Sequence, residues 1–163
     1  MSRTVSDILL SILVLLLQTT VVRFLSIQGI VPDIVLLWII YLALRHGQIY
    51  GTLAGFLLGL TLDLISGPES MLGLAALTKT LAGFIAGYFY NENKTLQTLG
   101  GYQFILITAM VSLVHNVIYF VLFLQGSGLQ WGDMLMLHGV PTTVYTTAVC
   151  LLPMFAFARK VLS

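Results

Sequence analysis

Charge and cysteine are scarce in this sequence. Charged residues make up 8% of the 163 residues, hydrophobic residues make up 58%, and the mean hydropathy is +1.01. Soluble domains contain about 25% charged residues, so this composition excludes an ordinary water-soluble domain. Cys150 is the single cysteine, which excludes a disulfide within the chain. No Cys/His cluster has zinc-ligand spacing, and we therefore expect neither a metal site nor a cofactor.

Catalytic motifs are also missing. The sequence contains no GxSxG turn, no HExxH helix, no phosphate-binding GxxxxGK[ST] loop, and no nucleophile with a recognisable base. The seven Lys and Arg residues form no basic cluster with interleaved aromatic residues, as nucleic-acid binding would require. The sequence therefore predicts a protein that is not an enzyme and does not bind nucleic acid.

Apolar stretches, in contrast, recur along the whole chain. A helix needs about 20 residues to cross a bilayer, because only a helix can satisfy its backbone hydrogen bonds in hydrocarbon. The first stretch is not followed by a signal-peptide cleavage pattern, so we interpret it as a retained span. We expect one all-α polytopic membrane domain over residues 1–163. Its six transmembrane helices are predicted at residues 5–25, 31–44, 48–66, 71–90, 102–124 and 140–158.

The basic residues predict the orientation of these spans. If the N-terminus is cytoplasmic, only Arg23 lies near the outer face, and Lys79 lies within a span. The other basic residues then lie on the cytoplasmic side: Arg3, Arg45, Lys94, Arg159 and Lys160. Cytoplasmic loops carry an excess of Lys and Arg, so both termini are predicted to be cytoplasmic. The outer connection, residues 125–139, is predicted to be either a short interfacial helix or a simple loop.

Glycine recurs at every fourth residue in the third predicted span. Gly51, Gly55 and Gly59 form one row, which Asp63 continues. A similar row in the fourth span consists of Ala75, Lys79, Gly83 and Gly87. Small residues four apart allow membrane helices to approach closely. We therefore expect these glycines to pack helices together, either within a hairpin of the two spans or against a single span of a partner.

The same rows suggest an ion pair inside the membrane. In an antiparallel hairpin turning at residues 67–71, we expect Gly51 opposite Gly87, Gly55 opposite Gly83, and Gly59 opposite Lys79. Asp63 then lies one helical turn, about 5.4 Å, from Lys79. A buried charge in a bilayer is costly unless it is paired, so the leading hypothesis is an Asp63–Lys79 pair. The alternatives are a snorkelling lysine with a solvated aspartate, or a proton or ion relay through both residues.

A polar stripe marks the fifth predicted span. Thr108, Ser112, His115 and Tyr119 are spaced by four, three and four residues, so they share one face, which we expect to line the interior of the bundle. His115 has two interpretations. It is either a proton carrier near neutral pH or, as we favour, a neutral imidazole hydrogen-bonded to a neighbouring helix.

Residues 31–90 contain motifs of a known family. Pro32 and Asp33 open the second span as a good helix start, with a proline in the first turn and a carboxylate near the positive end of the helix dipole. The later motif positions are Gly55, Phe56, Gly59, Leu60 and Asp63, followed by Leu72 and Gly73. In these motifs the chain resembles the rod shape-determining protein MreD family of bacterial inner membranes.

This resemblance implies a non-enzymatic inner-membrane subunit of the cell-elongation complex that determines rod shape. Such a subunit binds the bitopic protein MreC and, through it, the MreB filament and the peptidoglycan polymerase and transpeptidase pair. The family is also distantly similar to the six-helix substrate-binding S-components of ECF-type vitamin transporters, which implies a similar helix bundle. The alternative function is therefore a small-molecule uptake subunit, with its ligand in an outward pocket formed by the outer connections and the polar rows of spans four to six.

Overall fold

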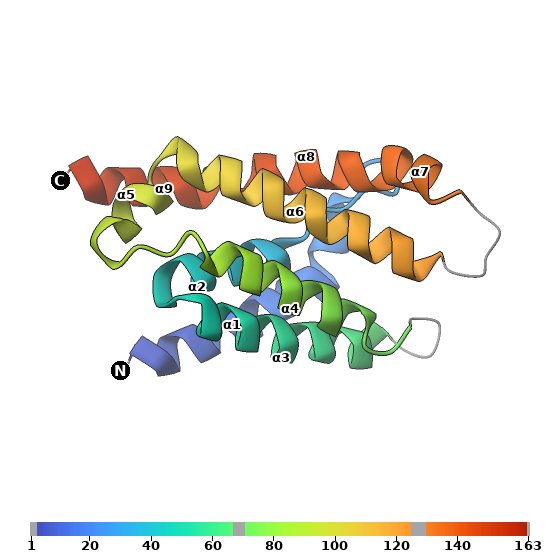
Figure 1. Cartoon of the computed structure of the whole chain (residues 1–163), viewed down its shortest axis with the longest axis horizontal. Coiled ribbons are helices and arrows are strands. Elements are labelled where there is room, and N and C mark those ends of the chain that lie inside the picture. Colours follow the sequence, from blue (N-terminus) through green and yellow to red (C-terminus); the bar gives the residue numbers. More distant parts are fainter. Residues whose placement is uncertain (1–2, 67–70, 125–129, 163) are drawn as a thin grey trace.

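The chain folds into a bundle of helices (Figure 1). A computed structural model describes residues 3–66, 71–124 and 130–162. The elements, in chain order, are α1 (Arg3–Thr20), η1 (Val22–Leu25), α2 (Ile34–His46), α3 (Gln48–Ser66), α4 (Leu74–Gly87), η2 (Glu92–Lys94), α5 (Thr95–Leu99), α6 (Tyr102–Phe123), α7 (Trp131–Met134), the π-helical turn η3 (Leu135–Gly139), α8 (Val140–Val149) and α9 (Leu151–Leu162). An isolated bridge between Ile27 and Ile30 closes the connection between η1 and α2.

The long helices coincide with the predicted spans to different degrees. Three of the described helices are long and apolar enough to cross a membrane: Gln48–Ser66, Tyr102–Phe123 and Gly132–Ala158. The helices at Thr4–Thr20, Ile34–His46 and Leu74–Gly87 are apolar but shorter. The helical class is confirmed, whereas six membrane crossings stay a prediction.

The last helix begins earlier than expected. Residues 125–129 of the predicted outer connection lie outside the described residues, but the chain is helical from Trp131 and continues into α8. The described part of the connection is therefore the start of the last helix, and neither a separate helix nor a loop. The π-helical turn η3 precedes Pro141. A proline ring crowds the carbonyl four residues earlier, and the wider turn relieves this crowding.

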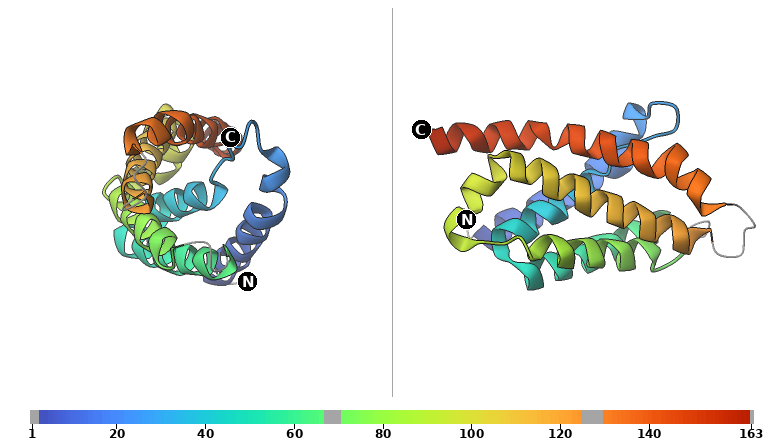
Figure 2. Two further views of the ribbon diagram at one scale, coloured as in Figure 1. Left: turned by 90° about the vertical axis from the view of Figure 1, so that its right-hand side faces the viewer. Right: turned by 45° about the horizontal axis from the view of Figure 1, so that its top comes forward.

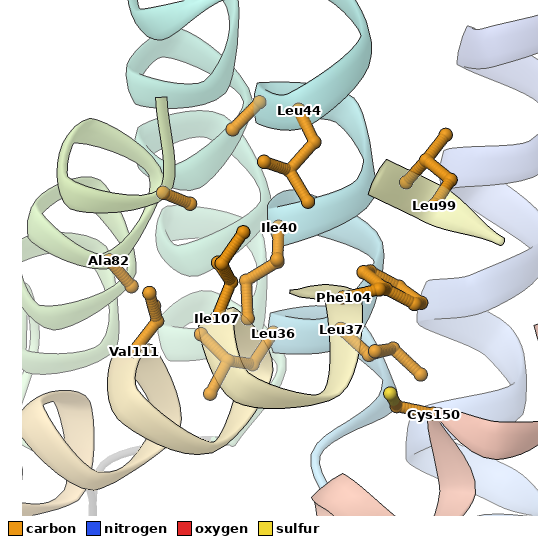
Figure 3. Close-up of a cluster of buried hydrophobic side chains, with 12 residues drawn as sticks. Leu36, Leu37, Ile40, Leu44, Ala82, Leu99, Phe104, Ile107, Val111 and Cys150 are labelled. Atoms are coloured by element: carbon orange, nitrogen blue, oxygen red, sulfur yellow. The ribbon is translucent and has the colours of Figure 1, made fainter. Parts of the chain in front are cut away.

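Helix α2 lies at the centre of the bundle. The end-on view in Figure 2 shows it inside a ring formed by the other helices. Its side chains at Val35, Ile39, Ile40 and Ala43 are fully buried, and its charged groups, Arg45 and His46, lie in the last turn. Residues of α2 also form the main core cluster with Ala82, Phe104 and Val111, as Figure 3 shows. A helix that is apolar all round is buried, and because other helices shield α2 from lipid, its 13 residues do not have to cross the bilayer alone.

The connections sort into two ends of the bundle. Both chain termini, the α2–α3 turn and η2 lie at one end, which we call the terminus end (Figure 1). The α2–α3 turn is a single residue, Gly47, whose φ of +94° favours glycine. The connection from η1 to α2, the end of α3, the start of α4, the end of α6 and α7 lie towards the opposite end, which we call the pocket end.

Helices α3 and α4 pack backbone to backbone at the glycine rows. A Cβ atom built on Gly59 would lie 2.5 Å from the carbonyl oxygen of Ala75, and one built on Gly51 would lie 3.0 Å from that of Gly83. Gly55 lies against the backbone of Lys79 in the same way. The expected register is therefore wrong by one helical turn, because Gly51 was expected opposite Gly87 and Gly55 opposite Gly83. Gly87 instead packs against Gln48 at the start of α3.

Candidate functional site

The register of α3 and α4 places Asp63 at the N-terminus of α4. Its carboxylate is 4% exposed and accepts hydrogen bonds from three backbone N–H groups, those of Gly73 (3.0 Å), Ala75 (3.1 Å) and Ala76 (2.9 Å). The first N–H groups of a helix have no partner within it, and the positive end of the helix dipole stabilises a carboxylate. The expected Asp63–Lys79 ion pair is therefore wrong, since Asp63 caps a helix instead.

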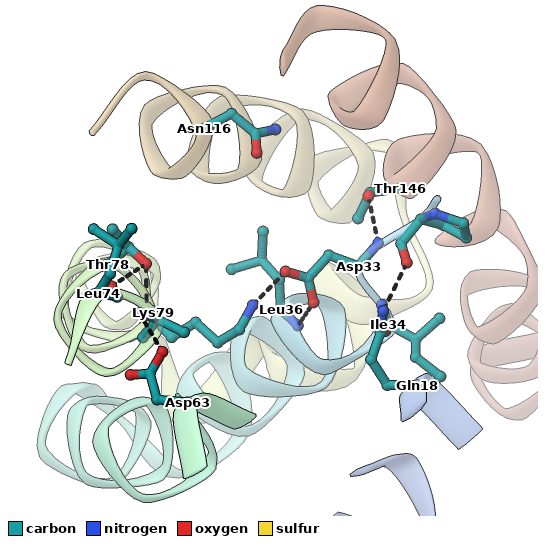
Figure 4. A network of polar contacts seen from close by, with 12 residues as sticks. Gln18, Asp33, Ile34, Leu36, Asp63, Leu74, Thr78, Lys79, Asn116 and Thr146 are labelled. Carbon is teal, nitrogen blue, oxygen red and sulfur yellow. Dashed lines mark hydrogen bonds and ion pairs between the residues drawn. The ribbon is translucent and has the colours of Figure 1, made fainter. Parts of the chain in front are cut away.

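Lys79 forms its ion pair with Asp33. The lysine is 3% exposed, and its Nζ atom extends from α4 to the Asp33 carboxylate, as Figure 4 shows. The other carboxylate oxygen of Asp33 accepts a hydrogen bond from the backbone N–H of Leu36 (2.8 Å), so the residue also caps α2. The sequence correctly indicated the helix start but missed the lysine, because a local motif carries no information on a contact 46 residues away.

Side chains from the first and last long helices hold the beginning of α2. The Gln18 side chain accepts from the N–H of Ile34 (2.8 Å) and donates to the carbonyl of Pro32 (3.3 Å). The backbone N–H of Asp33 donates to Thr146 Oγ1 (3.0 Å). Sequence reasoning predicted neither of these contacts. Gln18 and Thr146 share one feature, which is that each contacts backbone groups at the start of α2, next to Pro32.

The predicted polar stripe lies on the inner face of α6. Thr108 and Ser112 are fully buried, His115 is 6% exposed, and Tyr119 is half-buried. Neither ring nitrogen of His115 has a hydrogen-bond partner among the described residues. The predicted hydrogen bond from His115 to a neighbouring helix is therefore wrong for the described residues, although the side chain is buried as expected.

Asn116, next to His115, links two helices. Its side-chain amide donates to the carbonyl of Gly139 (3.1 Å) and to Thr143 Oγ1 (2.8 Å), which joins α6 to the last helix. The sequence analysis did not single it out. A buried amide in a membrane helix is a signal that could have identified it, because such a group requires a partner.

These polar groups surround a cavity of about 470 Å³ at the pocket end. Its lining comes from α1, the η1–α2 connection, α3, α4, α6 and the last helix. Its polar lining residues include Asp33, Lys79, His115, Tyr119, His138 and Thr142. The register of the bundle thus brings together polar residues that are far apart in the sequence.

Besides Gly55, Gly59 and Asp63, which contact α4, the family-motif residues divide into two groups. Pro32 and Asp33 line the cavity, and Gly73 precedes α4 with a φ of +96°, which favours glycine. Phe56 is 48% exposed and Leu72 is 73% exposed, so both face outward. The motif therefore combines residues that fix the starts of α2 and α4 with residues on the outer surface.

A second polar cluster lies at the terminus end. The Asp7 carboxylate is 4% exposed and lies 3.0 Å from His46 Nε2 and 3.8 Å from an Arg45 guanidinium nitrogen. This contact ties α1 to the last turn of α2. Sequence reasoning used Arg45 only to assign the orientation and did not consider Asp7. In both clusters the described charged groups link one helix to another. No group of three or more His, Cys, Asp or Glu residues in the described part of the chain could hold a metal ion.

Comparisons with known proteins agree with this architecture. The model of the rod shape-determining protein MreD family matches residues 2–161 of the chain. No match was found among curated proteins or among solved structures, so the likeness to ECF S-components stays a prediction. The match covers nearly all 163 residues, including the motif region and the apolar helices. The chain is therefore a membrane protein that belongs to the rod shape-determining protein MreD family.

Proposed function

We propose that this chain is a non-enzymatic subunit of the bacterial cell-elongation complex in the inner membrane. It crosses the membrane six times and binds an MreC-like bitopic protein. Through that partner it supports the MreB filament and the peptidoglycan polymerase and transpeptidase pair. The observation that carries this proposal is the family match over residues 2–161, since it spans nearly the entire chain.

The positions of the basic residues support cytoplasmic termini. Arg3 begins α1, Arg45 lies in the last turn of α2, and Lys94 ends η2, all at the terminus end. Arg159 and Lys160 lie in α9, which ends there as well. These basic residues, which favour the cytoplasmic side of a membrane, therefore all lie at the terminus end.

The structure also limits where a partner helix can bind. Because Gly51, Gly55 and Gly59 pack against α2 and α4, their rows are not free for a partner. Helix α1 offers another surface. Its side chains at Ile8, Ile12 and Leu16 are 54%, 51% and 56% exposed. Apolar grooves of about 410 and 400 Å³ lie on its two sides, one towards α3 and one towards α9. We propose that the single span of the bitopic partner packs on α1.

A pull-down from native membranes tests this proposal. We expect the tagged chain to co-purify a bitopic protein, identified by mass spectrometry. A Leu13→Trp change on the exposed face of α1 should reduce recovery of this protein, because the larger ring blocks helix contact. The matched control is Leu106→Trp on the exposed face of α6, which should leave recovery unchanged. Recovery of no bitopic protein with the unmodified chain would contradict the assembly role, and equal recovery by both variants would contradict the α1 surface.

The cavity favours a second candidate function, that of a small-molecule uptake subunit. Ligand pockets typically measure about 300–1,000 Å³ and combine apolar walls with a few polar groups, and the cavity of about 470 Å³ fits this description. The pull-down also distinguishes the two functions. Co-purification of ATP-hydrolysing transporter subunits, in place of a bitopic protein, would favour uptake.

A further inference from the structure

We propose that the cavity at the pocket end binds a small, uncharged, hydroxyl-rich ring, either a free sugar or the sugar headgroup of a lipid. This inference goes beyond the assembly role and concerns only the chemistry of the ligand. It rests on three features: an unpartnered polar side chain in the wall, balanced charge, and a combination of hydrogen-bonding groups with aromatic rings.

The first feature is His115. Its side chain lines the cavity, is 6% exposed, and has no hydrogen-bond partner at either ring nitrogen among the described residues. A buried polar group without a partner is unfavourable, because it has lost its hydrogen bonds to water without replacing them. A neutral imidazole offers one donor and one acceptor, which match a hydroxyl group that both accepts and donates. A ligand with several hydroxyl groups would therefore supply the hydrogen-bond partners that this side chain lacks.

The second feature is the balance of charge. Asp33 and Lys79 are the charged residues among the described lining residues, and they pair with each other. A charged ligand would lose its hydration without gaining a counter-charge, whereas an uncharged ligand avoids this penalty. The cavity therefore favours a neutral ligand over an anion or a cation.

The third feature is the arrangement of rings and polar groups along α6. The rings of His115 and Tyr119 are stacked with centroids 6.2 Å apart and an interplanar angle of 22°. Phe120 lines the cavity beside them, and Ser66, His138 and Thr142 add further polar groups to the lining. A sugar ring has C–H faces that pack on aromatic rings and hydroxyl groups at its edge that form hydrogen bonds. This combination matches the wall better than a purely apolar ligand does.

Binding of closely related neutral and charged sugars tests the proposal. The purified chain should be placed in lipid nanodiscs without glycolipid or sugar-based detergent, because a maltoside headgroup would compete for the cavity. Equilibrium dialysis then compares methyl α-glucoside with its charged counterparts, the methyl α-glycosides of glucosamine and glucuronic acid. We expect methyl α-glucoside to bind at least about tenfold more tightly than either charged sugar. Octyl glucoside, tested in competition, distinguishes the lipid source, since it should bind more tightly if the alkyl chain also contacts the protein.

Two variants localise the binding. His115→Leu removes both ring nitrogens but keeps an apolar side chain, so it should weaken binding at least about tenfold without lowering the melting temperature. Ser112→Ala is the matched control, because Ser112 is buried on the same helix with no described partner but does not line the cavity. It should leave binding unchanged. The proposal is overturned if neither glucoside binds at about 10 mM, if a charged sugar binds as tightly, or if His115→Leu binds like the unmodified chain.

Discussion

Two aspartates at the pocket end stabilise helix N-termini in different ways. Asp63 accepts hydrogen bonds from three backbone N–H groups at the start of α4, and among the described residues its carboxylate forms no ion pair. Asp33 accepts one backbone N–H at the start of α2 and pairs with Lys79 through its other oxygen. The lysine therefore supplies the counter-charge where fewer hydrogen bonds are available. Both carboxylates obtain the partners that a charge in a membrane requires.

Double-mutant cycles test this assignment at the scale of the residue. Lys79→Met leaves the Asp33 carboxylate without its cation and should destabilise the chain by about 3–5 kcal/mol. Combining it with Asp33→Asn should recover part of this loss, giving a coupling energy of about 0.5–3 kcal/mol. The free energy of unfolding in detergent is the measurement. The control cycle pairs Lys79→Met with Asp63→Asn, and its coupling should be smaller. A larger coupling to Asp63 than to Asp33 would contradict the structure.

At the scale of the element, α3 and α4 form the closest helix contact described here. Their glycines bring backbone against backbone, which increases dispersion contacts and leaves little space for a side chain. The same close contact fixes the register, and the register in turn places Asp63 at the N-terminus of α4. A change in the glycine row therefore affects both packing and capping.

A large substitution in this row should unfold the hairpin. Gly55→Leu would drive a side chain into the backbone of Lys79, and overpacking of this kind costs about 1–3 kcal/mol or more. We expect lower accumulation in membranes and a lower melting temperature. The matched control is Ala54→Leu, since Ala54 lines the groove between α1 and α3 and has room for the larger side chain. Normal accumulation of Gly55→Leu together with loss of the bitopic partner would show that the row serves the partner instead.

At the scale of the whole molecule, the two ends of the bundle carry different polar groups. The terminus end carries the basic residues and the Asp7, Arg45 and His46 cluster. The pocket end carries the cavity and the starts of α2 and α4. If the terminus end faces the cytoplasm, the cavity lies towards the outer half of the membrane. The orientation therefore decides which compartment can supply a ligand.

Cysteine labelling in intact cells tests this orientation. The native Cys150 is fully buried and would first be replaced by alanine. Gln130→Cys lies at the pocket end, and Lys94→Cys lies at the terminus end; both positions are exposed. A membrane-impermeant maleimide should label the first and not the second. Lysed cells provide the control, because both variants should then be labelled. The reverse pattern in intact cells would place the termini outside.

Much of the architecture was predictable because it depends on local sequence. The apolar runs indicated where the long helices lie, and the interior face of α6 followed from helical spacing alone. The family motif correctly identified the MreD family. The register of α3 on α4 was not predictable, since four-residue repeats pack equally well after a shift of one turn. The Asp33–Lys79 pair was missed for a related reason, because it depends on how α2 lies between the other helices.

The sequence by itself determined that this is a membrane protein and where its helices lie. Apolar composition and spacing decide this because they act on each segment separately. It also determined that glycine rows would form close contacts, since only small side chains allow backbones to meet. The tertiary structure decided which charges pair, that the short α2 lies at the centre, and that His115 faces a cavity. These features depend on the relative positions of distant segments, and many registers of the same helices satisfy the local rules equally well.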